Sequence, residues 1–393
     1  MPDLETRFRG LDRVRGPDLW GDIESRDPRP LPEGGAGRRL AAGAVALVLA
    51  AAGAVLVARA FLGDDRSVER PVRPAESPPA PVDPVVDVTL PIKWPSSIVY
   101  GEGSIWVAAS ANDGTGAGTI YRIDPDTAEI IAEIPTPAVP GWETGGGSME
   151  VADDDLWVAG GGASRKVVRI DSQSNRVVSE FAVRARFLGD LEIDEHGLWV
   201  TAFDEEHMYL LRLDPTTGAE EARVPLEGSY AREVVSVDGT LWVHQRQTHG
   251  STVGASVLVR VDPETASMAE VRVGSPASSV VEGDGFVWAI TWTAEDGNQL
   301  VRLDPRTSEL ALIPSRSLES VIALGGGGVW GVARRGQDLF EGRGSIVRFD
   351  PVTGRVDAGV GIEAGTIALA VAPGSVWVVG YEEGVTRVEL RPA

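Results

Sequence analysis

Residues 198–218, LWVTAFDEEHMYLLRLDPTTG, contain two signals that recur along the 393-residue chain. The first is a Trp between apolar residues, which returns every 42 to 51 residues, at Trp106, Trp157, Trp199, Trp242, Trp288, Trp330 and Trp377. The second is an Arg with an acidic residue two places on, which returns in phase at Arg122, Arg169, Arg212, Arg260, Arg302, Arg348 and Arg387. Seven linked copies at this period predict an all-β fold, a seven-bladed β-propeller.

The third copy shows how one blade is built. Strands are expected at residues 190–194, 198–202, 208–213 and 221–225, and the turn at 214–218 uses Asp, Pro and Gly where a tight turn needs them. The large Trp suits packing between neighbouring blades. The Arg is expected to pair with the neighbouring blade or with the turn Asp.

The two ends of the repeat region predict how the ring closes. The last copy contains a third strand at residues 385–389 and no fourth, while residues 86–91 look like a fourth strand with nothing before it. Pairing these segments gives six contiguous blades and one composite blade. Such a ring leaves no sheet edge between its first and last blades.

The segment before the propeller divides into three parts. Residues 1–39 are polar and predict a mostly disordered cytoplasmic tail, in which the apolar group around Trp20 is a possible contact for a cytoplasmic factor. Residues 40–62 predict a transmembrane helix, because 40–58 are uncharged and follow Arg38 and Arg39, which places the N-terminus inside. Residues 63–84 form a Pro-rich linker, and 85–393 the extracytoplasmic propeller. Cleavage after Ala60 is the alternative to an uncleaved anchor.

Charge and composition exclude some classes of function and of binding site. Residues 85–393 contain 24 basic and 45 acidic residues, so the propeller repels nucleic acid. The chain lacks cysteine, which excludes disulfides and thiolate metal sites. Basic residues are almost all Arg, which points to a GC-rich bacterial genome. No cofactor is expected, with Ca²⁺ or Mg²⁺ as the alternative.

The copies resemble the bacterial YVTN and streptogramin-lyase-like propellers, through phrases such as GSIWVA at 103–108 and YRIDPDT at 121–127. The resemblance implies the propeller fold. Lyases of that group use a His and a Glu-x-His pair with bound Mg²⁺. None of the four histidines here, at His196, His207, His244 and His249, has a Glu two residues before it, so the resemblance transfers no catalytic residue. His244 and His249 are expected in a long loop at 244–256.

Aligning the copies on the repeated Trp predicts a site at the mouth of the central channel. One position per copy falls at the start of a first strand, nine residues before the Trp in the first five copies and slightly shifted in the last two, and it is polar in all seven: Ser97, Ser148, Asp190, Glu233, Ser279, Ser320 and Thr366. Nearby loops add Trp94, Trp142, Glu143, Arg186, Tyr230 and Arg232. These residues predict a shallow site for a polar or cationic ligand, and a channel lined by water is the alternative.

Together these features predict a membrane-anchored, extracytoplasmic propeller that acts as a non-catalytic binding, scaffold or sensor module for an envelope protein or a small polar ligand. One alternative is a metal-dependent lyase or hydrolase at the channel mouth, using Asp190 and Glu233. The other is a transmembrane regulator whose tail binds a cytoplasmic factor.

Overall fold

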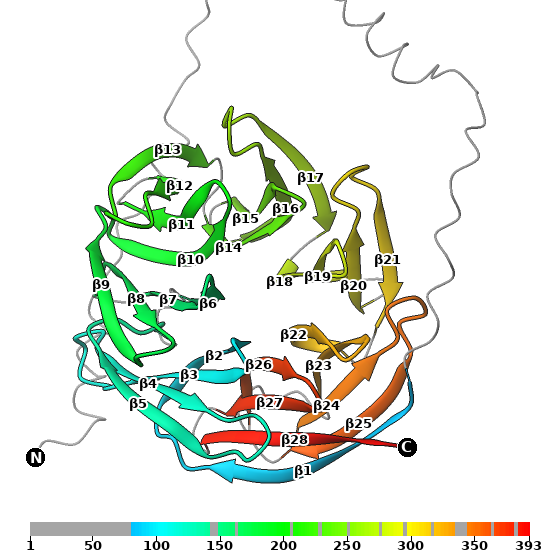
Figure 1. The fold of residues 1–393 in the computed structure, drawn as a ribbon. Helices are drawn as coiled ribbons and strands as arrows, with labels where there is room; N and C mark the ends of the chain where they lie inside the picture. Colours follow the sequence, from blue (N-terminus) through cyan, green and yellow to red (C-terminus); the bar gives the residue numbers. More distant parts are fainter. Residues whose placement is uncertain are drawn as a thin grey trace, which may run out of the picture. The chain divides into compact units, whose positions relative to one another are not determined.

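The computed structural model describes residues 80–141, 148–161, 164–204, 207–226, 230–249, 252–274, 277–293, 297–315, 318–334, 344–362, 365–380 and 384–393. These residues form seven four-stranded antiparallel sheets arranged around a central axis (Figure 1). The predicted seven-bladed propeller is therefore confirmed. Blade 1 is β2 to β5, the numbering continues along the chain, and blade 7 is β26 to β28 with β1.

Each blade adds its strands outward from the axis (Figure 1). The innermost strands are β2 (Pro95–Gly101), β6 (Met149–Ala152), β10 (Phe187–Asp194), β14 (Tyr230–Val237), β18 (Ala277–Gly283), β22 (Leu318–Gly325) and β26 (Thr366–Ala372). The second strands are β3 (Ser104–Ser110), β7 (Asp155–Ala159), β11 (Gly197–Phe203), β15 (Thr240–His249), β19 (Phe286–Thr293), β23 (Gly328–Arg334) and β27 (Ser375–Gly380). The third strands are β4 (Gly118–Ile123), β8 (Lys166–Asp171), β12 (Met208–Leu213), β16 (Thr252–Val261), β20 (Gly297–Leu303), β24 (Gly344–Phe349) and β28 (Gly384–Pro392). The outermost strands are β5 (Ile130–Thr136), β9 (Arg176–Ala182), β13 (Glu220–Leu226), β17 (Met268–Gly274), β21 (Leu310–Pro314), β25 (Val356–Ile362) and β1 (Val82–Leu90).

The third blade matches its sequence pattern closely, since each predicted strand lies within β10, β11, β12 or β13. The turn between β12 and β13 uses the expected chemistry. Asp214 Oδ1 accepts the backbone N–H of Thr216 at 3.0 Å and of Thr217 at 2.6 Å. Gly218 then takes a φ of 70°, which a residue without Cβ adopts at little cost.

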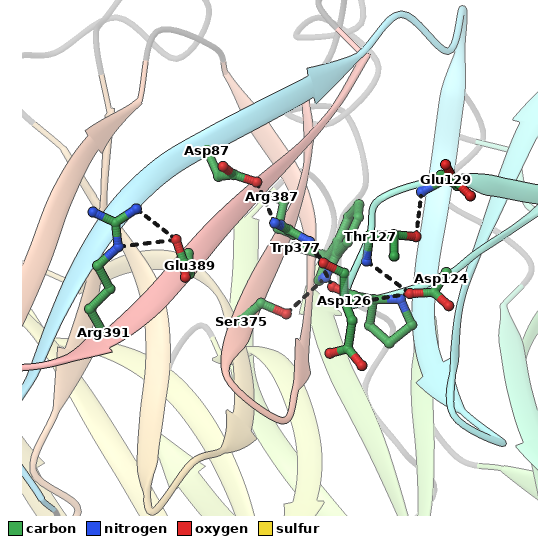
Figure 2. Close-up of polar contacts among 11 residues, drawn as sticks. Asp87, Asp124, Asp126, Thr127, Glu129, Ser375, Trp377, Arg387, Glu389 and Arg391 are labelled. Atoms are coloured by element: carbon green, nitrogen blue, oxygen red, sulfur yellow. Dashed lines mark hydrogen bonds and ion pairs between the residues drawn. The ribbon is translucent and has the colours of Figure 1, made fainter.

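The composite seventh blade closes the ring as predicted. Strand β1 pairs antiparallel with β28, from Val82 opposite Pro392 to Leu90 opposite Val385. The strand begins at Val82, so the last residues of the predicted linker already belong to the sheet. Figure 2 shows the seam, where Arg387 on β28 forms an ion pair with Asp87 on β1 (Nη2–Oδ2, 2.5 Å).

The repeated Trp forms the core between blades, as expected. The seven side chains are at most 2% exposed. Each one packs against the following blade: Trp106, for example, lies among Leu156 and Val158 of blade 2, and Trp377 contacts Ile105 and Val107 of blade 1 across the closure. The core is thus a ring of interfaces between sheets.

Four of the repeated Arg side chains reach the next blade: Arg122, Arg212, Arg348 and Arg387. Arg122 lies over Trp106, 4.9 Å from the ring centroid, and donates to Asn175 Oδ1 (3.0 Å) in the turn after β8. Arg387 donates in the same way to Pro125 O (3.1 Å). Blade 7 has no turn between its third and outermost strands, because β1 comes from the other end of the chain. There Arg348 of blade 6, 1% exposed, donates instead to Ala80 O at 2.9 Å.

The predicted tail (1–39), membrane span (40–62) and most of the linker (63–84) lie outside the described residues. Within the part of the chain that the structure describes, no helix is long and apolar enough to span a membrane.

Candidate functional site

The structure places all seven predicted mouth residues on the innermost strands or directly beside them (Figure 1). Ser148 precedes β6, and the other six lie within their strands. Arg186 is exposed, with its guanidinium 5.4 Å from the centroid of Phe187. Arg232 and Ser320 belong to β14 and β22, and Trp142 and Glu143 lie outside the described residues.

Three mouth residues have a structural role that the sequence did not reveal. Each accepts a backbone N–H from the innermost strand of the next blade. The bonds are Leu191 N to Ser148 Oγ (2.8 Å), Val234 N to Asp190 Oδ2 (3.0 Å) and Ile322 N to Ser279 Oγ (3.1 Å). An innermost strand has one edge that its own sheet leaves unpaired, and its buried N–H groups need acceptors. These side chains therefore clamp neighbouring blades together.

Carboxyl groups on the same innermost strands carry shifted pKa values. Burial, opposed by hydrogen bonds from Ser148 and Val234, raises the pKa of Asp190 to about 7. Burial also raises the pKa of Glu150 and Glu192, and neighbouring carboxylates, including Glu282 of blade 5, add to both shifts. Glu150 Oε2 accepts the N–H of Ile193 at 2.8 Å, so it also links two blades. The channel wall therefore contains acids that hold their protons near neutral pH.

The fourth mouth residue, Glu233, has a different partner. Its Oε2 lies 2.6 Å from Nδ1 of His244, whose side chain is 1% exposed. The expectation that His244 and His249 lie in a loop is wrong, because β15 and β16 extend as a long hairpin through this region. One signal could have revealed the pair: His244 follows its Trp by two residues, as Thr201 does, and Thr201 Oγ1 accepts the N–H of Asp190 at 2.8 Å.

The described part of the mouth contains no cluster of metal ligands. Among the residues that the structure describes, no three His, Asp or Glu side chains lie close enough to hold a metal ion. Asp190 and Glu150 already accept backbone N–H groups, and Glu233 bonds the buried imidazole of His244. The described residues of the mouth therefore contain no set that would fit the Mg²⁺ of the lyase resemblance.

A hollow lies on blade 1, beside the connector that leads into β2. Its volume is about 540 Å³, and it is lined by residues 93–94, 109–111, 117–119, Tyr121 and 135–137. Trp94 stands at its rim, 39% exposed and with a φ of 54°. Its carbonyl accepts the N–H of Ser110 at 3.0 Å, which fixes this connector between β1 and β2.

No protein-family model matches the chain, and no curated protein matches it. Its structure is similar to a chain of hydrazine synthase from Kuenenia stuttgartiensis, with a TM-score of 0.55, 14% identity, and coverage of 78% of this chain and 98% of that chain. It is also similar to the WD40 domain of Pan2 from Neurospora crassa, with a TM-score of 0.55, 11% identity, and coverage of 81% and 97%. At these identities the likeness establishes a WD40-like seven-bladed propeller and nothing about its ligand.

Proposed function

We propose that this chain is a non-catalytic binding module, held at a bacterial cell membrane by residues 40–62, with its N-terminus in the cytoplasm and its propeller outside. The anchor is supported by the uncharged residues 40–58 and the preceding Arg38 and Arg39. The binding role is supported by the propeller fold and by the clamping role of Ser148, Asp190 and Ser279, whose side-chain oxygens already accept hydrogen bonds.

The observation that carries the binding role is the exposed Trp94. A left-handed backbone costs a residue with a Cβ about 1 kcal/mol, and the exposed 39% of Trp94 forgoes the gain of burial. Stability therefore does not explain Trp94. Exposed aromatic residues beside a hollow are typical anchors of protein interfaces.

The hollow beside Trp94 has the shape and chemistry to receive an apolar side chain. Its lining includes Ala109, Ala111, Ala117 and Gly118, and a Cβ on Gly118 would collide with the carbonyl of Ala109. Tyr121, Pro135 and Pro137 add further apolar surface to the lining. We propose that it takes an apolar or proline-containing stretch of an envelope protein.

The test compares Trp94→Ala with Phe187→Ala. Both aromatic side chains are 39% exposed, but Phe187 lies on blade 3. The full chain, purified in detergent, should capture a defined partner from an envelope extract, identified by mass spectrometry. We expect Phe187→Ala to retain that partner and Trp94→Ala to lose at least about tenfold in affinity, which is about 1.4 kcal/mol. Equal capture by both variants, at unchanged melting temperatures, would remove Trp94 from the binding site.

One observation favours a second function, a lyase or hydrolase at the mouth. A carboxylate that orients an imidazole, as Glu233 does for His244, is a common part of acid–base catalysis. The imidazole is buried, so a substrate would have to displace the structure around it. Elemental analysis of the purified protein, and melting curves with and without EDTA, test the metal-dependent form. A stoichiometric metal would support the metal-dependent enzyme. The absence of both a bound metal and an EDTA-dependent shift in melting temperature would contradict it.

The regulatory role of the tail rests on Trp20 alone and stays a prediction. A pull-down with residues 1–39 tests it, and Trp20→Ala is the control.

A further inference from the structure

The outermost strand of blade 5, β21, differs from the outermost strands of the other six blades. It lies at the rim of the ring, and among the described strands none pairs with its outer edge (Figure 1). Its sequence, LALIP, contains no charged residue. Each of the other six contains at least one: Glu133 in β5, Glu180 in β9, Arg223 in β13, Glu270 in β17, Asp357 in β25 and Asp87 in β1. Charged residues on an edge strand oppose pairing with another sheet, so β21 is the edge that lacks this protection.

The repeat shows which residue makes the difference. The residue that precedes the repeated Arg on each third strand has a partner directly opposite it on the outermost strand. In blade 5 this partner is Leu312, which lies opposite Val301 and is 54% exposed. In the other blades the equivalent residues are polar or Gly: Glu133, Glu180, Arg223, Glu270, Gly359 and Thr89. Packing within the ring therefore does not account for Leu312.

Leu312 belongs to an apolar row on one face of β21. Side chains two residues apart share a face of a strand, so Leu310 and Pro314 lie on either side of Leu312. Leu310 is 36% exposed, and Pro314 is also exposed. The opposite face holds the strand in place, because Ile313 is buried in the core between blades 5 and 6. The exposed row is therefore presented by a strand that is fixed in the ring.

The free edge of β21 also presents backbone groups. The carbonyl of Glu309 accepts a backbone N–H from the β20 arm of the hairpin, and the N–H of Ser315 donates to that arm. Bonded and non-bonded residues alternate along an antiparallel pair, so residues 311 and 313 also bond to β20. The N–H and C=O groups of Leu310 and Leu312 therefore point away from the sheet. Pro314 has no N–H, but its carbonyl points the same way.

We propose that β21 is the edge at which a second copy of this chain pairs, antiparallel, about a two-fold axis beside Leu312. The two Leu312 residues exchange N–H···O bonds, and each Leu310 N–H meets the carbonyl of Pro314 in the other copy. Their side chains form one continuous apolar row across the axis. This surface lies on blade 5 and does not rest on the binding role of Trp94.

The two-fold axis identifies the occupant, because it places a residue at the axis against its own copy. The same pairing on four other blades would bring Glu133, Glu180, Arg223 or Glu270 against an identical charge, which opposes it. Leu312 instead meets Leu312, and the pair gains by burial. Two chains of net charge −22 repel each other, so self-pairing needs a strand without charge, which β21 provides. Only two short strands are joined, so the dimer should be weak and dependent on concentration.

Disulfide cross-linking tests the geometry. The chain contains no cysteine, so Leu312→Cys introduces a single thiol, and a cross-linked dimer must join residue 312 to itself. In a bonded antiparallel pair the two Cα atoms lie about 5.5 Å apart, which a disulfide can span. Val178→Cys is the matched control, because Val178 is 51% exposed on the outermost strand β9. In the full chain in detergent, mild oxidation should cross-link Leu312→Cys at least about tenfold faster, since pairing raises the effective concentration of the thiols. Equal rates overturn the proposal.

Sedimentation velocity of the full chain in detergent, over a range of concentrations, tests the association itself. Leu312→Glu gives blade 5 the residue that blades 1, 2 and 4 have at the same repeat position, so it should fold with an unchanged melting temperature. We expect the parent chain and Val178→Glu to form a concentration-dependent dimer, and Leu312→Glu to stay monomeric at the same concentrations. A parent chain that stays monomeric, or a dimer that Leu312→Glu leaves intact, overturns the proposal.

Discussion

At the residue scale, stability depends on the repeated Trp. Trp199 is 1% exposed and packs among Leu241 and Val243 of the next blade. Trp199→Ala leaves a cavity between two sheets that cannot close without moving both blades, so we expect a loss of about 3–5 kcal/mol in the free energy of unfolding. Urea unfolding followed by tryptophan fluorescence measures it. Trp94→Ala is the control, since its exposed ring should cost less than about 0.5 kcal/mol. Equal losses would contradict an interblade core.

Replacing one of the residues that clamp neighbouring blades should have a smaller effect on the free energy of unfolding. Ser148→Ala removes the acceptor for Leu191 N and leaves a buried donor unpaired, which should cost about 1–3 kcal/mol. Ser96→Ala is a matched control, because the Ser96 hydroxyl makes one long contact of 3.4 Å to Ala108 O. Urea unfolding should separate the two variants. If both lose the same small amount, Ser148 contributes no clamp.

At the element scale, the junction of β1 and β28 depends on Arg387. Its guanidinium meets Asp87 on β1 and the carbonyls of Pro125 and Asp126 in the next blade (Figure 2). The side chain is 13% exposed, so solvent screens these contacts only partly. Arg387→Ala should cost about 2 kcal/mol. It should also speed hydrogen exchange in β1.

Arg391 is the control for that prediction. It lies on the same strand and pairs with Glu389, but it is 54% exposed, so Arg391→Ala should change stability by less than about 0.5 kcal/mol. Exchange in β1 that does not differ between the two variants would mean that strand pairing alone closes the ring.

The strands were predictable from sequence, whereas the contacts between blades were not. The Trp and Arg periods fix the blade count and the closure, because period and turn chemistry are local properties. The bond from Asp190 to Val234 joins two copies, and the period does not say which oxygen meets which N–H. The hairpin around His249 was missed because QRQTH lacks the alternation that marks a half-buried strand.

At the scale of the whole molecule, two groups of acidic residues have pKa values that are shifted in opposite directions. The turn residues Asp124 and Asp214 have lowered pKa values, because Thr127 and Thr217 donate hydrogen bonds to them. The channel residues Asp190, Glu150 and Glu192 have raised pKa values, chiefly through burial. Acidification below the ordinary carboxyl pKa range reduces the stability that the first group contributes. A rise in pH toward neutral reduces the stability that the second group contributes.

Stability should therefore fall as pH rises from about 5 to about 8. In the folded state the pKa of Asp190 is raised from 3.8 to about 7, so between these values the native chain binds more protons than the unfolded chain. The free energy of unfolding is then greatest at the low end of this window, and it declines while Asp190, Glu150 and Glu192 keep protons in the folded chain that the unfolded chain has released. Urea unfolding at a series of pH values should show the decline. Asp190→Asn should reduce the slope, because its amide oxygen still accepts the N–H of Val234 but nothing there titrates. Asp214→Asn should leave the slope unchanged, since the lowered pKa of Asp214 acts only at more acidic pH. A stability that is constant or increasing over this range would show that the channel carboxyls are hydrated and ionised in the native ring.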